Sequence, residues 1–330
     1  MTTSITRVDW DDPDAARLRA AQQAELRDRY GEDDIGHEMT GDEIADVVLV
    51  RVDGEAVATG ALRDLGDDPT YDAVPPGTGE LKRMYVLPEH RGRGYSRLVL
   101  SELENLAAAS HGWRRLILET GVLQPEAIGL YLRAGYLPIE NYGEYVGVAD
   151  SRCFAKDLVP TPRAPRPGER PTVTITRTHW SDPVAAALRF AMWLDIEVRY
   201  PEIVARTPGG FEADDPAQGV GALTTLLAWV DGHPVACATL RAAREGYPAG
   251  SGELKKVWVD EAARGSGAAR ALLEAVEDDA RARGLTSVVL QTGIRQPEAV
   301  TLYLSAGYRP VLPFFDFTGD ALSLWMAKDV

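Results

Sequence analysis

The chain carries one sequence pattern twice, and this internal repeat limits its possible folds more than any other feature. Residues 112–138 and 284–310 align without a gap, and 15 of the 27 aligned positions are identical. The match continues upstream, where residues 80–86 (ELKRMYV) parallel residues 253–259 (ELKKVWV). A repeat of this length predicts two domains of the same fold rather than two unlike domains.

A short proline-rich segment separates the copies. Residues 159–171 (VPTPRAPRPGERP) contain five prolines and show no apolar periodicity. Proline fixes φ and cannot donate a backbone hydrogen bond, so this segment is expected to be an extended, semi-rigid linker. The predicted organisation is an N-terminal domain at 1–158, a linker at 159–171 and a C-terminal domain at 172–330, each domain falling within the usual ~100–200 residues.

Both copies present the same order of predicted elements. In the first copy Asp12-Pro13 marks a helix start and Asp53-Gly54 marks a tight hairpin turn. The predicted strands are 4–8, 47–52, 55–63, 80–86, 115–120, 136–139 and 151–156, and the predicted helices are 13–29, 95–110 and 125–134. This order predicts an α+β fold with a central mixed, mostly antiparallel sheet flanked by helices.

Composition argues against several functional classes. The chain has 35 basic and 50 acidic residues, a net charge of −15, whereas a nucleic-acid-binding surface is usually basic. Cys153 and Cys237 stand far apart and the five histidines form no HxxxH or HxH pair, so no disulfide framework or metal site is predicted. Without a signal peptide or an apolar run of ~20 residues, no membrane association is expected and the predicted location is the cytoplasm.

Each copy has a glycine-rich segment between a predicted strand and a predicted helix. It reads RGRGYS at 91–96 and RGSGAA at 264–269. Glycines let the backbone approach a ligand closely, and the free N–H groups at a helix start favour a phosphate. A Walker A loop would need Gly-Lys-Ser/Thr, which is absent, and a dinucleotide fingerprint would need a glycine where Arg97 and Arg270 stand.

With these segments, each copy resembles a GCN5-related N-acetyltransferase (GNAT). The acyl-CoA motif of that family is Gln/Arg-x-x-Gly-x-Gly/Ala, which residues 264–269 match fully, whereas the first copy has Ser96 at the last position. The second family motif, Leu-Tyr-x-x-x-Gly-Phe/Tyr, is met by LYLRAGY at 130–136 and LYLSAGY at 302–308. The resemblance covers nearly the whole chain and implies two tandem GNAT domains with acetyl-CoA as co-substrate.

The resemblance also implies which residues contact acetyl-CoA. The pyrophosphate is expected on the loop N–H groups, and the acetyl oxygen on a backbone N–H of the preceding strand. The expected cofactor-binding residues are Met84, Tyr85, Val86, Arg91, Gly92, Arg93, Gly94, Tyr95 and Ser96, and in the second copy Val257, Trp258, Val259, Arg264, Gly265, Ser266, Gly267, Ala268 and Ala269. Arg97 and Arg270 are further candidates for phosphate contacts.

Acetyl transfer to an amine needs the neutral amine, and a primary amine has a pKa of ~10.4 in water, so a base helps at neutral pH. In the family this base is often a glutamate on the strand before the loop, which corresponds to Glu80 and Glu253. The motif tyrosine, Tyr131 or Tyr303, is expected to protonate the departing CoA thiolate. Regular strand alternation predicts that Met84 shares the face of Glu80.

The acceptor side differs between the copies. Glu119 is replaced by Gln291, and residues 142–145 (YGEY) are replaced by 314–317 (FFDF). Carboxylates at Glu38, Glu119 and Glu144 are candidates for binding a cationic amine in the first copy. Residues 124–126 and 296–298 (QPE) are predicted to start a helix.

The predicted function is therefore acetyl transfer from acetyl-CoA to the primary amine of a small molecule. Two alternatives stay open: one domain is catalytic and the other is a structural or acyl-CoA-sensing module, or the acceptor is a protein amine. The expected state is a monomer, with the two domains forming an intramolecular pseudo-dimer, or a homodimer.

Overall fold

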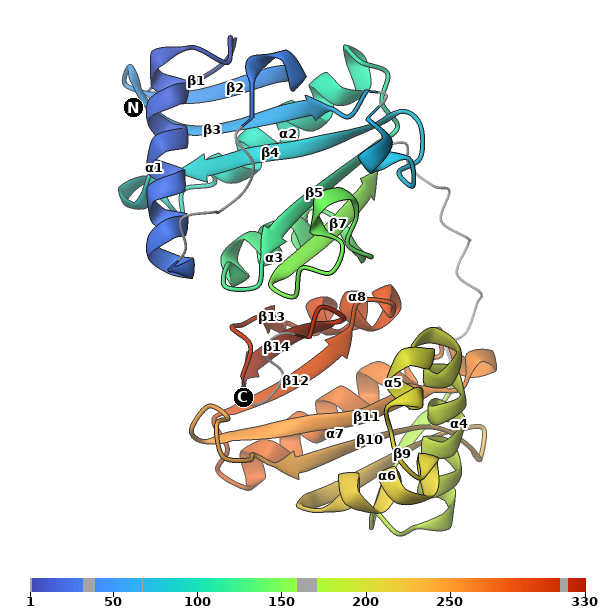
Figure 1. Ribbon diagram of the computed structural model, residues 1–330. Coiled ribbons are helices and arrows are strands. Elements are labelled where there is room, and N and C mark those ends of the chain that lie inside the picture. The colour runs from blue at the N-terminus through green and yellow to red at the C-terminus, as the bar shows by residue number, and fades with distance from the viewer. Residues whose placement is uncertain (1, 32–38, 67, 159–170, 315–319) are drawn as a thin grey trace. The chain divides into compact units, whose positions relative to one another are not determined.

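The computed structural model describes residues 2–31, 39–66, 68–158, 171–314 and 320–330 (Figure 1). The chain divides into two compact units. The N-terminal unit comprises residues 1–163 with 319–321, and the C-terminal unit comprises residues 164–318 with 322–330. Most of the predicted linker, residues 159–170, lies outside the described part of the chain.

The N-terminal unit contains seven strands and three α-helices among its described residues. In chain order they are β1 (Thr3–Val8), α1 (Pro13–Tyr30), β2 (Ile44–Val52), β3 (Glu55–Asp64), β4 (Thr78–Val86), α2 (Tyr95–Ala109), β5 (Arg115–Gly121), α3 (Pro125–Arg133), β6 (Leu137–Ile139) and β7 (Ser151–Asp157). Each predicted element is present, with bounds that differ by no more than a few residues.

The C-terminal unit repeats this order and has two short helices between α4 and its second strand. Its described elements are β8 (Val173–Thr178), α4 (Pro183–Arg199), α5 (Pro201–Ala205), α6 (Gly210–Gly219), β9 (Ala222–Val230), β10 (His233–Ala242), β11 (Ser251–Val259), α7 (Ala268–Ala282), β12 (Ser287–Gly293), α8 (Pro297–Ser305), β13 (Arg309–Pro310) and β14 (Ser323–Asp329). The short helices α5 and α6 follow α4, the counterpart of α1.

Each unit is built on one seven-stranded sheet. The strand order is β1-β2-β3-β4-β5-β7-β6 in one unit and β13-β14-β12-β11-β10-β9-β8 in the other. All neighbouring strands are antiparallel except β4–β5 and β11–β12, which are parallel. The predicted mixed, mostly antiparallel sheet is therefore confirmed.

Helices cover both faces of each sheet (Figure 1). In the C-terminal unit Leu226 packs in a core cluster with Leu272 and Val276 of α7, whereas its neighbour Leu227 packs with Ala185 of α4. Successive strand residues point to opposite faces, so α7 and α4 lie on opposite sides of the sheet. The same arrangement of α2 and α1 leaves the middle of β4 enclosed between two helical layers.

Local sequence signals account for the turns and helix starts. The side chain of Asp12 accepts hydrogen bonds from the backbone of Asp14 and Ala15 at the start of α1, and Pro13 occupies the first helical position, which needs no N–H donor. Asp53 and Gly54 both have positive φ, 49° and 91°, as a two-residue hairpin turn requires.

A β-bulge interrupts β4 and β11 at the same place. Ala61 pairs with Lys82 and Thr59 with Tyr85, so one residue of β3 faces two residues of β4. At the bulge Arg83 adopts a φ of 55°, and Lys256 in β11 adopts 53°. Such a conformation is costly for a residue with a Cβ and must be held by its surroundings.

The bulge makes the prediction of regular alternation wrong beyond Lys82. A Cβ on Gly60 would clash with both Met84 and Val99, so Met84 lies on the α2 side of the sheet. Tyr85 instead packs with Ala15 and Leu18 on the α1 side. An inserted residue inverts the face of every side chain after it, and no glycine or proline in the sequence signals this insertion.

Candidate active site

The glycine-rich segments form the turns that start α2 and α7. Gly92 and Gly94 have φ values of 76° and 88°, and Gly265 and Gly267 have 85° and 96°. These left-handed conformations are accessible to glycine at little cost. Nothing lies within 4 Å of a Cβ built on Gly265 or Gly267, so the turn leaves open space above the helix start.

The two turns differ in how many backbone donors they leave available. In the N-terminal unit the N–H groups of residues 92–96 donate no hydrogen bond to any described residue. In the C-terminal unit the Ser266 N–H donates to the Ala263 carbonyl at 3.2 Å, and the Ala268 N–H donates to Ser266 Oγ at 3.3 Å. Both turns can bind an anion at a helix N-terminus, but the first offers more donors.

The arginines of these turns have unequal surroundings. Arg91 Nε donates to the Val86 carbonyl at 3.0 Å, and its guanidinium pairs with Glu25 of α1 at 2.5 Å. Arg270 donates to the Ser305 carbonyl at 2.8 Å, at the end of α8. The guanidinium of Arg264 makes no hydrogen bond or ion pair with the described residues. Of these three side chains, Arg264 is the one left available to a phosphate.

The two parallel strands part just before the bulge. Pairing of β4 with β5 ends at Leu81 and Leu118, and pairing of β11 with β12 ends at Glu253 and Val289. We refer to the remaining parts of these strands, residues 82–86 with 119–121 and 254–259 with 290–293, as the splayed segments. Backbone groups on their facing edges have no partner across the gap, so an extended ligand with amide groups could pair with them.

Glu80 lies at the base of the first splayed segment and is fully buried. Its Oε1 accepts from Tyr142 Oη at 2.7 Å and lies 3.1 Å from Lys82 Nζ, and its Oε2 accepts from Arg63 at 3.4 Å. Arg63 also donates to Tyr71 Oη at 2.8 Å. This predicted base is therefore surrounded by positive charge and hydroxyl groups and has no contact with solvent.

Glu253 occupies the equivalent position with a simpler set of partners. Arg241 donates to its Oε2 from Nε at 2.8 Å and again from Nη2, and Tyr247 Oη donates to its Oε1 at 2.8 Å. Lys255 Nζ lies 3.6 Å from the same Oε1. Burial with too few compensating negative charges lowers the pKa of Lys255 to about 8.

The hydroxyl that contacts each glutamate comes from a different loop. Tyr142 precedes β7 in the N-terminal unit, and its position is occupied by Phe314 in the C-terminal unit. Tyr247, before β11, donates the hydrogen bond there and packs on Phe314 with ring centroids 4.8 Å apart. Both units thus keep a hydroxyl on the carboxylate while changing its source.

The motif tyrosines lie on α3 and α8 and are largely buried. Tyr131 and Tyr303 are 5% and 6% exposed. Burial raises the pKa of both hydroxyls, and the nearby carboxylate of Glu119 raises the pKa of Tyr131 further. Both side chains therefore stay protonated at neutral pH, as a proton donor must.

Glu119 lies in the splayed part of β5 and is partly buried. Burial raises the pKa of its carboxyl group, Lys82 and a hydrogen bond from Ser151 lower it, and the charges of Glu80 and Glu144 raise it. In the C-terminal unit Gln291 Nε2 donates to Ser323 Oγ at 2.5 Å instead. A carboxylate and a neutral amide therefore occupy equivalent positions in the two units. Glu38 and residues 315–317 of the divergent segment lie outside the described residues.

One pair of structural contacts beside the candidate site could not be predicted from the sequence. Tyr30 ends α1 and its hydroxyl accepts from the Leu123 N–H at 3.1 Å, while Tyr200 accepts from the Arg295 N–H at 2.8 Å. A Cβ on Gly121 or Gly293 would lie about 2 Å from these hydroxyls. The glycine that follows each predicted strand leaves room for this contact, which fixes the loop leading to the motif tyrosine.

A second pair of contacts explains the QPE segments. Arg29 lies 3.5 Å from Glu126 and also donates to the Leu123 carbonyl at 2.8 Å. Arg199 lies 2.6 Å from Glu298. The glutamates start α3 and α8, as predicted, and hold them to the end of α1 or α4.

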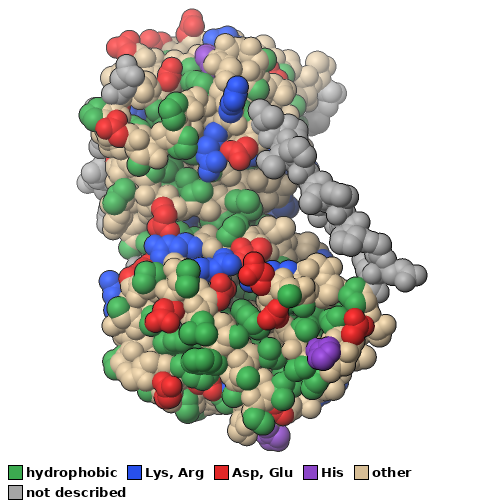
Figure 2. Space-filling view, turned by 90° about the vertical axis from the view of Figure 1, so that its right-hand side faces the viewer, with side chains coloured by type: hydrophobic (Ala, Val, Ile, Leu, Met, Phe, Trp, Pro, Cys, Tyr) green, Lys and Arg blue, Asp and Glu red, His purple; other side chains and the backbone are tan. Residues whose placement is uncertain are grey.

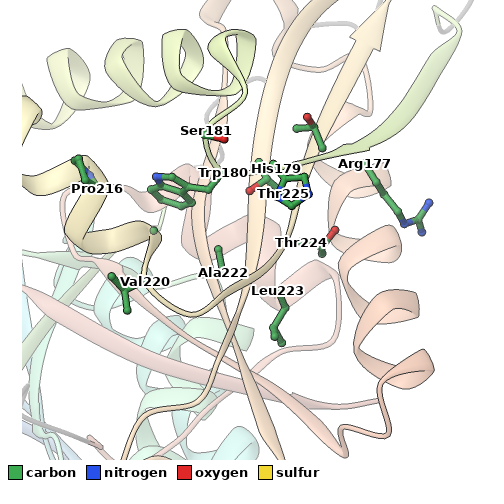
Figure 3. A pocket seen from close by; sticks show the side chains of 12 residues that line it. Arg177, His179, Trp180, Ser181, Pro216, Val220, Ala222, Leu223, Thr224 and Thr225 are labelled. Carbon is green, nitrogen blue, oxygen red and sulfur yellow. The ribbon is translucent and has the colours of Figure 1, made fainter.

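An open pocket of about 660 Å³ in the C-terminal unit lies at a different place (Figure 3). It is lined by residues from the β8–α4 junction, the end of α6 and the start of β9, among them Trp180, Pro216 and Leu223. None of the predicted catalytic or cofactor-binding residues lines it. It therefore has no part in the candidate active site.

Among the residues that the structure describes, no group of three or more His, Cys, Asp or Glu is placed to hold a metal ion. No helix in the described ranges is both long and apolar enough to cross a bilayer.

Comparison with known proteins identifies the family. The sequence model of the family described as "Acetyltransferase (GNAT) family" matches residues 5–136 and 190–308, which together make up more than half of the chain. An IAA acetyltransferase of Azospirillum brasilense is 40% identical over 103 residues, which cover 31% of this chain and 65% of that protein. The chain thus spans just under two thirds of that relative's length.

Solved structures align with one unit at a time. One, described as an acyl-CoA N-acyltransferase of Klebsiella pneumoniae, is 29% identical, with a TM-score of 0.40, and the match covers 48% of this chain and 99% of that one. The ribosomal-protein-S18-alanine N-acetyltransferase of Escherichia coli is 22% identical, with a TM-score of 0.35, and the match covers 48% and 94%. Because the family description matches a region in each unit, the chain belongs to the acetyltransferase (GNAT) family.

Proposed function

We propose that each unit binds acetyl-CoA and transfers its acetyl group to the primary amine of a small molecule. The proposal rests on two neighbouring structural features that both units share. A glycine turn opens a helix N-terminus, and next to it a bulged strand parts from its parallel neighbour. The turn suits a pyrophosphate, and the free strand edge suits the amide-bearing arm of a CoA thioester.

The cofactor would be held mainly by backbone groups. The N–H groups of residues 92–96 would bind the pyrophosphate in the N-terminal unit, and those of residues 265–269 in the C-terminal unit, with Arg264 adding a charged contact. A backbone N–H of residues 84–86 or 257–259 would hold the acetyl oxygen as negative charge develops on it. This assignment keeps the predicted cofactor-binding residues but gives Arg91 a supporting role through Glu25.

Proton transfer would use a tyrosine as the acid. When the amine attacks, the C–S bond of the thioester breaks, and Tyr131 or Tyr303 would donate a proton to the CoA thiolate. Each hydroxyl is kept protonated by burial.

The predicted bases Glu80 and Glu253 are sealed from solvent, so we propose that they act through their hydroxyl partners, Tyr142 and Tyr247. In the N-terminal unit Glu119 is a second carboxylate able to take the proton of the amine, because its raised pKa brings it closer to the pH of the reaction. The C-terminal unit has Gln291 at that position and lacks this second acceptor.

The acceptor is proposed to be a small amine, cationic in the N-terminal site because Glu119 and Glu144 lie there. A sensing role for the C-terminal unit is the second candidate, and the replacement of Glu119 by Gln291 favours it over acetylation of a protein amine.

A screen of small amines and peptides, reading CoA release with the full chain, tests the proposal. A small cationic amine is expected to give the highest kcat/KM. Release with peptides alone would move the function to protein amines, and no release with any amine would refute catalysis.

A further inference from the structure

The chain contains five lysines, and four of them are held by a carboxylate within hydrogen-bonding distance. Lys82 lies 3.1 Å from Glu80, Lys156 2.7 Å from Glu104, Lys256 3.4 Å from Asp214 and Lys328 2.6 Å from Glu277. Lys255 is the exception, because no carboxylate of the described residues lies within hydrogen-bonding distance of its amine. Its Nζ lies 3.6 Å from Glu253, whose other oxygen already accepts twice from Arg241.

Lys255 is also placed beside the proposed acetyl site. It lies on the splayed part of β11, two residues before Val257, where the strand edge has no partner on β12. Its side chain is 21% exposed, so the amine is neither sealed in the core nor free in solution. The structure therefore places a weakly paired amine next to the segment expected to hold the thioester carbonyl.

The charges around Lys255 disfavour its protonated form. Arg241 of β10, Lys256 of β11 and Arg244 of the β10–β11 connection all add positive charge, and Glu253 opposes them. Tyr247 also contacts Glu253 but is neutral, because burial and the charge of Glu253 raise its pKa to about 12. With its pKa lowered to about 8, Lys255 at pH 8 has on the order of 100-fold more neutral amine than an ordinary lysine.

We infer that Lys255 is a self-acetylation site, modified by acetyl-CoA bound in the C-terminal unit. The lone pair of the neutral Nζ attacks the thioester carbonyl, the C–S bond breaks and an amide bond forms. The proton lost from Nζ goes to the departing thiolate, so the products are Nζ-acetyl-lysine and CoA with a free thiol. This inference rests on the proposed function, because the thioester must first bind to this unit.

The equivalent lysine of the N-terminal unit provides a matched control. Lys82 pairs with Glu80 and also donates to Tyr145 Oη, and Glu144 lies 3.7 Å away. Lys82 therefore has three polar partners within 4 Å, whereas Lys255 has Glu253 at 3.6 Å. Asp316, which stands where Glu144 stands in the first copy, lies outside the described residues.

The test uses the full chain with isotope-labelled acetyl-CoA between about pH 6.5 and 9.5, a range spanning the titration of a group near pH 8. Peptide mass spectrometry then follows the label on all five lysines. We expect Lys255 to be labelled at least about ten-fold faster than Lys82, with a rate that levels off above pH 8. The chain unfolded in urea should lose this preference, and Lys255→Arg should carry no label at position 255.

Calorimetry with a thioether analogue of acetyl-CoA, which cannot transfer its acyl group, separates the two ways of failing. If the analogue binds the C-terminal unit and Lys255 is labelled no faster than Lys82, the inference is wrong and the proposed function stands. If the analogue does not bind that unit, the proposed function of the unit fails together with the inference.

Discussion

The two units surround the same buried glutamate with different partners. Glu80 shares its charge with Arg63 and Lys82, and Arg63 has a second carboxylate, Glu43, at 3.1 Å. Glu253 depends mainly on Arg241, which is 1% exposed and donates twice to one of its oxygens. A network with several members tolerates the loss of one member better than an isolated buried pair does.

The equivalent helices α1 and α4 differ as well. Phe190, Leu194 and Val198 are exposed on α4, where α1 has Ala20, Ala24 and Asp28 at the corresponding positions. Apolar side chains are also plentiful on the face of the C-terminal unit shown in Figure 2. The two copies have thus kept the glycine turn and the motif tyrosine, while the exposed residues of the first helix and the partners of the buried glutamate differ between them.

The largest expected effect is on stability and tests whether the partners of Glu80 and Glu253 differ as described. Glu253→Gln leaves Arg241 buried without a charge partner and should cost about 3–5 kcal/mol of unfolding free energy. Glu80→Gln should cost less, about 1–3 kcal/mol, because Arg63 keeps Glu43 and Lys82 keeps Glu144. Urea unfolding followed by hydrogen exchange of each unit measures both values, and equal losses would contradict the proposed difference between the networks.

The second prediction concerns the glycine turns. Gly94→Val and Gly267→Val place a β-branched residue at φ values of 88° and 96°, so each should weaken acetyl-CoA binding in its own unit by roughly 100-fold. The other unit should bind as before. Calorimetry of the two variants checks this, and loss of both sites from one substitution would show that the sites are not independent.

The third prediction compares the tyrosines. Tyr131→Phe should lower kcat for the N-terminal site by roughly 10–100-fold with little change in KM, because a general acid is lost while packing is kept. Tyr303→Phe should do the same for the C-terminal site. Steady-state kinetics in a background with the other turn disabled by the valine substitution separates the two, and a pure KM effect would argue for a binding role.

The smallest expected effect concerns pH. Burial raises the pKa of Glu119 in the folded state, so its ionisation lowers stability as pH rises from the unfolded value, near 4.3, through the raised folded value. Glu119→Gln removes this penalty, so the stability of the variant relative to the parent should increase as pH rises from the unfolded value toward neutral pH. Unfolding at several pH values measures it. A constant difference across pH would contradict the assignment, and Gln291→Glu should introduce the same dependence in the C-terminal unit.

Much of the fold could be predicted from the sequence because its signals are local. Asp-Pro pairs at helix starts, Asp-Gly at hairpin turns and alternating apolar residues all act within a few positions, and the repeat doubled each signal. The turns at Gly94 and Gly267 were found for the same reason.

The β-bulges and the surroundings of the buried glutamates could not be predicted, because they depend on contacts beyond the local sequence. Nothing in the local sequence marks Arg83 or Lys256 as bulged, because surrounding structure imposes their positive φ. Arg241, the main charge partner of Glu253, is 12 residues away in sequence on β10, and the hydroxyl that contacts Glu253 comes from Tyr247 in the β10–β11 connection. The burial of both predicted bases, and with it their proposed action through a tyrosine, could therefore be seen only in three dimensions.

The central claim is that both units bind acetyl-CoA, and titration calorimetry of the intact chain with the thioether analogue tests it most directly. The account predicts two sites per chain, reduced to one by either Gly94→Val or Gly267→Val. A single site in the parent chain, lost with one of these substitutions and unaffected by the other, would contradict it and leave one unit without a cofactor.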